Sequence, residues 1–278
     1  MRERRTVVGV DGSVAAFRAL DAAASEAERR ATALEIVCCV NDLAEATPVL
    51  RSASDRVKER HPDLILRASA VVGDPVQVLA ERSRGAALTV VGARAAVGTG
   101  GLLPHAVGQR LAVRVHGPLL VVRGREPSGP EHSGPRGVLL GVGGAEAAEA
   151  ALFAFEEAEM RRTHVCVLHA WTDRQPVYGS PAGPVESDLA RQAATAACLP
   201  GVAVAPLRET HPQLRVVTWS VRGTPWRALL AATADAELAV IAVRHRRVRP
   251  ERLRLGPVAQ ALLRHSHCPV AVIPVPRG

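Results

Sequence analysis

The stretch TVVGVDGSVAAFRAL, from Thr6 to Leu20, sets the expected fold of the first half of the chain. It opens as a short apolar run, turns through Asp-Gly-Ser, and then places apolar residues at steps of three or four. Such a run is typical of a strand covered on both faces, and the later spacing is typical of one face of a helix. We therefore predict a strand over residues 5–11, followed by a helix that Ser13 caps.

The same pattern returns in the second half as VLLGVGGAEAAEAAL, from Val138 to Leu152. Two later blocks also recur: VVGDPVQVLAERSRGAALTVVGAR as SVRGTPWRALLAATADAELAVIAVR, and AVRVHGPLLVVR as LLRHSHCPVAVIP. The three matches keep their order at offsets of 132, 150 and 151 residues, which indicates an internal duplication. We predict a first domain over residues 1–123 and a second over 137–278, joined by a Gly-, Pro- and Ser-rich linker over 124–136.

Each copy alternates apolar strands with helical segments, which predicts an α/β fold with a doubly wound parallel sheet. The expected strands cover residues 5–11, 34–40, 64–72, 87–92 and 118–123, then 137–142, 164–170, 214–221, 238–243 and 269–274. Asp74-Pro75 and Thr224-Pro225 each supply a cap and a first-turn proline for a helix. Pro200 and Gly201 predict a break in the second helical segment of the second copy.

Composition excludes several classes of protein. The chain is 47% hydrophobic, and its five scattered cysteines form neither a C-x-x-C pair nor a metal-ligand spacing with histidine. We expect neither a disulfide framework nor a bound metal. No apolar run reaches the roughly 18 residues of a membrane span, and the N-terminus lacks a signal-peptide apolar region. We therefore expect a cytoplasmic protein with no membrane partner.

The net charge of +8 raises the question of nucleic acid as a partner. The charge is spread over both copies of an arginine-rich chain, which argues against that interpretation. We also find no Ser-His-Asp set and no paired carboxylates, so we expect no catalytic residues and no enzyme activity.

These blocks resemble the universal stress protein family in its tandem form. The resemblance rests on VVGVDGS, Gly73-Asp74-Pro75, ALTVVGAR and HGPLLVVR in the first copy, and on Gly223-Thr224-Pro225, AELAVIAVR, LGPVAQALLRHS and HCPVAVIP in the second. It implies two five-stranded sheets of order 3-2-1-4-5, similar to adenine nucleotide alpha hydrolases. It also implies that the two domains pack as a pseudo-dimer through their terminal strands, while association of two whole chains stays open.

Ligands of such sheets bind at the carboxyl ends of the strands where the strand order reverses. In the first copy, the strands at that point end at Asp11 and Gly92. By resemblance to the members that bind ATP, Asp11 would hold the ribose, the backbone at Val40 the adenine, and Gly92 the phosphates. The alternative for Asp11 is that Asp-Gly-Ser only turns the chain from strand to helix.

The phosphate loop of those members reads G-x-x-G, nine residues, then G-[ST]. Here Ala95 replaces the second glycine, and His105-Ala106 replaces the final pair. The remaining candidates for phosphate contacts are out of register with the pattern: Gly98, Gly100, Gly101 and His105. A histidine at the position of His105 is more often a solvated surface residue, and a helix N-terminus disfavours its protonated form.

The second copy departs further from that pattern. Gly143 stands in place of the aspartate, Ala242 and His245 replace the early glycines, and Pro257 replaces the hydroxyl residue. ATP therefore stays open as a cofactor in the first domain only.

The loop of the second copy has instead become RHRRVRPERLR, residues 244–254, with six arginines and one glutamate. It suggests an anion site made of Arg244, Arg246, Arg247 and Gly256, although a solvated loop or pairing with acidic groups of the other copy would explain it too. Three hypotheses follow. The favoured one is a non-enzymatic, stress-associated regulator or binding module with degenerate nucleotide sites. The others are an ATP-binding sensor with slow ATPase activity, and a polyanion binder.

Overall fold

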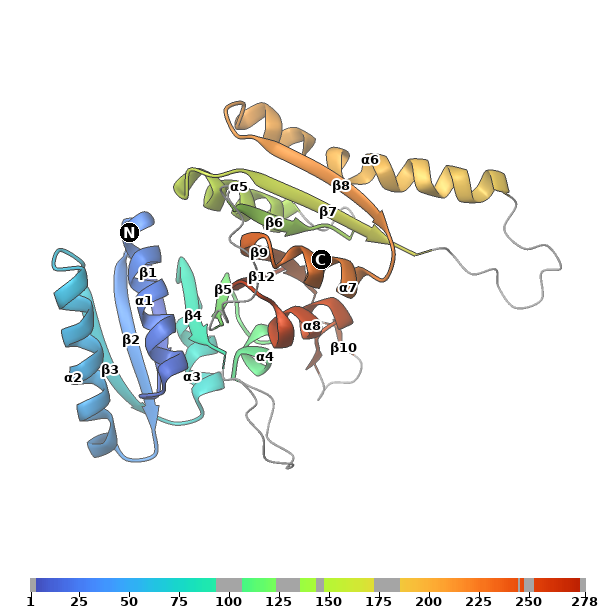
Figure 1. Ribbon diagram of the computed structural model, residues 1–278. Helices are drawn as coiled ribbons and strands as arrows, with labels where there is room; N and C mark the ends of the chain where they lie inside the picture. The colour runs from blue at the N-terminus through green and yellow to red at the C-terminus, as the bar shows by residue number, and fades with distance from the viewer. Residues whose placement is uncertain are drawn as a thin grey trace. The chain divides into compact units, whose positions relative to one another are not determined.

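The computed structural model describes residues 4–93, 107–123, 136–143, 148–172, 186–244, 246–247 and 253–275 (Figure 1). Its contacts divide the chain into two compact units. Unit 1 comprises residues 1–129 and 243–278, and unit 2 comprises residues 130–242. The compact units therefore do not follow the sequence repeats, because the C-terminal part of the second copy contributes to unit 1.

Unit 1 is built on five parallel strands: β1 (Arg5–Val10), β2 (Ala33–Val40), β3 (Leu66–Val72), β4 (Leu88–Gly92) and β5 (Leu119–Val122). They lie in the order β3-β2-β1-β4-β5. A strand of the second copy, β12 (Val270–Pro274), pairs antiparallel with β5, with Val270 opposite Val121. The terminal strands of the two copies are thus hydrogen-bonded neighbours inside unit 1.

Among its described residues, unit 1 contains the helices α1 (Val14–Arg29), α2 (Leu43–Arg60), α3 (Pro75–Arg82), α4 (Val107–Ala112) and α8 (Pro257–His265). Val91 faces α4, since a Cβ added to Gly108 would lie 3.6 Å from its side chain. Gly92, the next residue of β4, faces Ala15 of α1. Successive strand residues point to opposite faces, so α1 and α4 cover opposite faces of the sheet.

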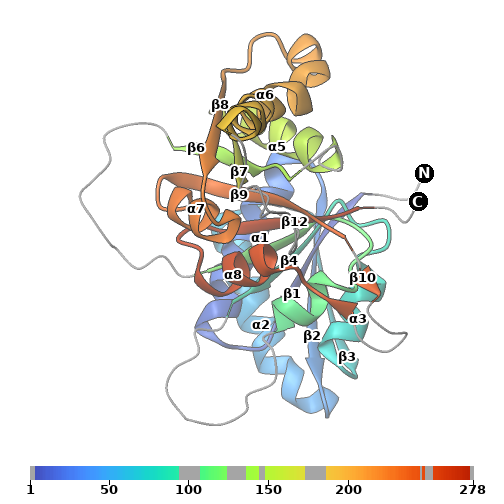
Figure 2. The same cartoon turned by 90° about the vertical axis from the view of Figure 1, so that its right-hand side faces the viewer.

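The segment of the second copy that belongs to unit 1 contacts the first copy through a helix as well as through β12. Helix α8 contacts both α4 and β12, beside which Figures 1 and 2 show it. The Arg123 guanidinium donates a hydrogen bond of 3.0 Å to the carbonyl oxygen of Leu263 at the end of α8. Arg123 is half-buried, and desolvation lowers its pKa.

Unit 2 contains four parallel strands in the order β9-β6-β7-β8. In chain order its elements are β6 (Gly137–Gly141), α5 (Ala148–Met160), β7 (Val165–Trp171), α6 (Glu186–Thr210), β8 (Val216–Arg222), α7 (Pro225–Ala232) and β9 (Ala236–Val243). The predicted break at Pro200 is wrong, because α6 continues through both Pro200 and Pro206. Each proline removes only one backbone hydrogen bond, and packing on β7 and β8 keeps the chain helical.

The helices begin where the sequence predicts, but the predicted cap residue does not always make a cap hydrogen bond. Ser13 caps α1 as expected, since its hydroxyl accepts from the Ala16 N–H at 3.2 Å. Asp74 precedes α3 without a side-chain cap bond, as does Thr224 before α7. The Asp74 carboxylate instead accepts from Arg110 of α4 at 3.1 Å, so it ties two helices together.

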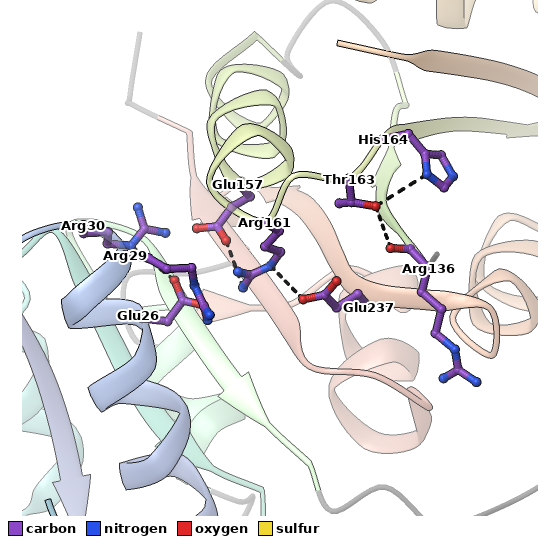
Figure 3. A network of polar contacts seen from close by, with 9 residues as sticks. All are labelled: Glu26, Arg29, Arg30, Arg136, Glu157, Arg161, Thr163, His164 and Glu237. Carbon is purple, nitrogen blue, oxygen red and sulfur yellow. Dashed lines mark hydrogen bonds and ion pairs between the residues drawn. The ribbon is translucent and has the colours of Figure 1, made fainter. Parts of the chain in front are cut away.

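An ion pair between a buried glutamate and an arginine recurs at the end of the first helix of each copy. In unit 1, Glu26 is 2% exposed and lies 2.7 Å from Arg29. In unit 2, Glu157 is 1% exposed and lies 2.9 Å from Arg161, which also reaches Glu237 at 3.5 Å (Figure 3). Removing one partner of a buried ion pair leaves the charge of the other buried and uncompensated, which is strongly destabilising.

We expect Glu157→Gln to lower the free energy of unfolding by about 3 kcal/mol, because it leaves the Arg161 guanidinium buried without its closest carboxylate. Glu237→Gln is the matched control: Glu237 is 48% exposed, so its pairing contributes about 0–1 kcal/mol. Urea denaturation followed by circular dichroism measures both. Equal losses for the two variants would contradict this account.

A second prediction concerns the contact between β4 and α1. A Cβ on Gly92 would lie 2.3 Å from the Ala15 carbonyl oxygen, and a backbone atom cannot rotate away. Gly92→Ala should therefore destabilise the protein by about 1–3 kcal/mol. Gly143→Ala, whose new Cβ would meet nothing within 4 Å, should leave the melting temperature nearly unchanged. Differential scanning calorimetry of both variants tests the contrast.

Candidate functional site

A cavity of about 140 Å³ opens at the carboxyl ends of β1, β2 and β4 in unit 1. Its polar wall is formed by Asp11 and Ser13, which follow β1, and by the start of α1. Val37 of β2, Leu79 of α3 and Val107 of α4 supply apolar wall. The cavity is therefore a small, mostly apolar crevice with one carboxylate at its edge, at the place where the strand order reverses.

Asp11 takes part in the turn from β1 to α1, which is one of the two roles that the sequence suggested for it. Its Oδ1 accepts from the Ser13 N–H at 3.0 Å, and Gly12 between them has φ +78°, a conformation that favours glycine. The carboxylate nevertheless borders the cavity. The turn thus holds Asp11 at the crevice, so the structural role of this residue and a ligand-binding role are compatible.

Gly92 also borders the cavity, but packing alone explains why it is glycine. Helix α1 approaches the end of β4 so closely that no side chain fits there. The structure brings Asp11 and Gly92 together, as the sequence predicted.

Val40 is placed differently from the expected adenine contact. It does not border the cavity, and its carbonyl oxygen accepts from the Gly73 N–H at 3.4 Å. Cys39 and Val37 border the cavity instead, because alternate residues of β2 share one face. The period-two pattern of the strand is the signal that could have identified them from the sequence.

Burial raises the pKa of the Cys39 thiol to about 11, and the neighbouring Cys38 and Asp74 raise it further in the same direction. The thiol is therefore neutral at physiological pH. It serves as apolar wall of the crevice rather than as a nucleophile.

The other predicted site residues are placed only in part. Gly98, Gly100, Gly101 and His105 lie outside the described residues. Arg244 is exposed at the end of β9. Arg246 and Arg247 form β10 (Arg246–Arg247), which pairs antiparallel with β11 (Leu253–Arg254), but their side chains are also outside the described part.

Gly256 begins helix α8 with φ −67° and has open space where a Cβ would point, so nothing in its surroundings requires glycine. Gly143, which replaces Asp11 in the second copy, is likewise exposed with open space beside it. The second copy thus lacks the carboxylate that borders the crevice of unit 1.

Within the described residues, no group of three His, Cys, Asp or Glu side chains could hold a metal ion. No helix in that part of the chain is long and apolar enough to cross a membrane.

Comparison with known proteins agrees with the duplicated α/β architecture. The model of the universal stress protein family matches residues 3–123 and, a second time, residues 135–274. The chain belongs to the universal stress protein family. The two matches coincide closely with the two copies recognised in the sequence.

Relatives in the family match over almost the whole chain. One universal stress protein of Mycobacterium tuberculosis is 28% identical over 289 residues, covering 96% of this chain and 95% of the relative. Another from the same species is 27% identical over 316 residues, covering 98% and 95%. A solved universal stress protein structure from Archaeoglobus fulgidus has a TM-score of 0.62 at 15% identity, covering 99% of this chain and 100% of that one, and shows the shared fold.

The neutral state of Cys39 is testable by alkylation. With a pKa of about 11, only about one Cys39 thiol in ten thousand is ionised at neutral pH, so iodoacetamide should modify it far more slowly than the exposed Cys198. The Cys39 rate should then rise about tenfold per pH unit through pH 9. Peptide mass spectrometry reads out each cysteine. Equal rates at neutral pH would show that Cys39 is ionised.

Proposed function

We propose that this universal stress protein is a non-enzymatic binding module of the stress response, with one site in unit 1 that recognises a nucleoside. The observation that carries the proposal is the crevice at the switch between β1 and β4, with Asp11 at its edge. Apolar walls suit a planar base, and a carboxylate is a strong acceptor for the two hydroxyls of a ribose. Adenosine or its phosphates fit this chemistry.

The phosphate end of the site supports the proposal less. Ala95, His105 and Ala106 stand where backbone access and a hydroxyl are needed. A chain that keeps its ribose acceptor while losing its phosphate residues should recognise the nucleoside part of a ligand more than its charge.

The candidate nucleophiles in the described part of the crevice wall support a non-enzymatic role. Cys39, the nucleophilic residue in the crevice wall with a shifted pKa, is held protonated. The Ser13 hydroxyl oxygen accepts from the Ala16 N–H as the cap of α1, which is a structural role. Neither side chain is activated for attack by a base among the residues that border the crevice.

Asp11 offers the direct test. Asp11→Asn keeps the acceptor oxygen that makes the turn with Ser13 but removes the charge, whereas Asp11→Ala removes both. We expect adenosine affinity, measured by calorimetry, to fall about tenfold for Asn and more for Ala, because a charged hydrogen bond contributes about 1.5–3 kcal/mol.

Asp55→Asn is the control, since Asp55 is exposed on α2, away from the crevice wall, and makes the same change of net charge. Adenosine binding that persists unchanged in Asp11→Ala would refute the proposed site. Hydrolysis of ATP by the purified protein, abolished by Asp11→Ala, would favour the ATP-binding sensor instead.

A further inference from the structure

Strand β8 ends the sheet of unit 2, and its outer backbone groups can be assigned from the hydrogen bonds at its two ends. The Val165 N–H bonds to the Arg215 carbonyl at 3.0 Å, and the Gly223 N–H bonds to the Trp171 carbonyl at 2.7 Å. The backbone N–H and C=O groups of the odd-numbered residues of β8 therefore point toward β7. In a parallel pair the intervening residues face away, so the backbone groups of Thr218, Ser220 and Arg222 point outward. Among the described strands, none pairs with this outer side.

The same strand exposes large apolar side chains on one face. Trp219 is 49% exposed and Val221 is 42% exposed. Trp219 is in register with Leu168, and Leu168 with Gly141, which faces Leu229 of α7. Trp219 and Val221 thus share the α7 face of the sheet, at its uncovered edge.

Arginines flank this strand in the sequence. Between Glu209 and Asp235 the chain carries three arginines and no carboxylate. Arg215 and Arg222, at the two ends of β8, are exposed, as is Arg227, whose guanidinium lies 5.1 Å from the ring centroid of Trp226. Arg208, from α6, adds a fourth exposed guanidinium, which donates to the Val216 carbonyl at 2.9 Å.

The edge strand β3 of the first copy has the same geometry but different side chains at two positions. Ile65 and Gly73 make the same bonds to the inner strand as Arg215 and Gly223 do. At an offset of 150 residues, Ser69 stands in place of Trp219 and Val72 in place of Arg222. The first copy also exposes Ile65 and Val72 here, at 59% and 57%, and Arg67 is exposed on β3. What distinguishes the second copy is the exposed tryptophan of β8 and the arginine at its end.

We propose that β8 is a docking strand for an extended acidic segment of a partner protein. The segment would add to the edge of the sheet through the outward N–H and C=O groups of Thr218, Ser220 and Arg222. Its apolar side chains would cover Trp219 and Val221, and its carboxylates would pair with the flanking arginines. This inference concerns unit 2 and goes beyond the nucleoside site.

The choice of occupant follows from the backbone and the charge. A row of outward amide groups is complementary to another polypeptide strand and not to a nucleic acid, which has no such ladder. A second copy of β8 would bring its own Arg215 and Arg222 against these arginines, and like charges across strands are destabilising. An acidic strand satisfies both groups at once.

The test uses the full-length protein and a fluorescein-labelled peptide of alternating valine and glutamate, followed by anisotropy. We expect saturable binding that weakens several-fold in about 0.5 M salt, where exposed charges are screened. Trp219→Ser, which restores the residue of the first copy, should weaken binding at least about tenfold. Ser220→Pro should do the same by removing one outward N–H without changing charge.

The matched control is Ala70→Pro, at the position of β3 that corresponds to Ser220, and it should leave binding unchanged. Circular dichroism establishes that each variant is folded. The proposal fails if the peptide does not bind, or if folded Trp219→Ser and Ser220→Pro variants both bind like the parent. It also fails if oligothymidylate displaces the peptide while Ser220→Pro has no effect. A concentration-dependent dimer in sedimentation that Ser220→Pro abolishes would assign β8 to self-association and overturn it too.

Discussion

Helix α1 leaves β1 on one face of the sheet and helix α4 covers the other, and the crevice of unit 1 depends on this divergence. Two glycines make it sterically feasible: Gly12 turns the chain with φ +78°, and Gly92 lets the α1 backbone approach β4. Asp11 is held at the crevice because its carboxylate closes the same turn. The turn that positions α1 therefore also positions the carboxylate that is the candidate ligand-binding group.

The two copies keep the same frame but differ where a ligand or partner could touch them. Both retain a buried glutamate–arginine ion pair at the end of the first helix. The first copy keeps the carboxylate at the crevice, whereas the second has Gly143 there. The second copy alone carries Trp219 on its edge strand. These differences fit a division of labour, with a small ligand held by unit 1 and a protein segment bound by unit 2.

Most of the fold could be predicted because apolar runs and their spacing report burial directly. The predicted strands agree with the observed ones to within about two residues, since the inner strands are apolar runs covered on both faces and the edge strands are apolar enough to follow the same pattern. Local signals failed where tertiary contacts decided the outcome. Packing on β7 and β8 carries α6 through Pro200, and Asp74 bonds to Arg110 rather than to its own helix. Cys39 borders the crevice and Val40 does not, because only one face of β2 is turned toward the crevice. Which face that is became clear only from the structure.

The central claim is that unit 1 recognises a nucleoside with little help from phosphate, because Asp11 remains while the phosphate loop has lost its pattern. Calorimetric titration of the same protein with adenosine and with ATP and Mg²⁺ tests it most directly. The account predicts two affinities within about tenfold of each other, a difference of about 1.4 kcal/mol or less. ATP binding that is hundreds of times tighter than adenosine binding would contradict it and would show that a working phosphate site persists.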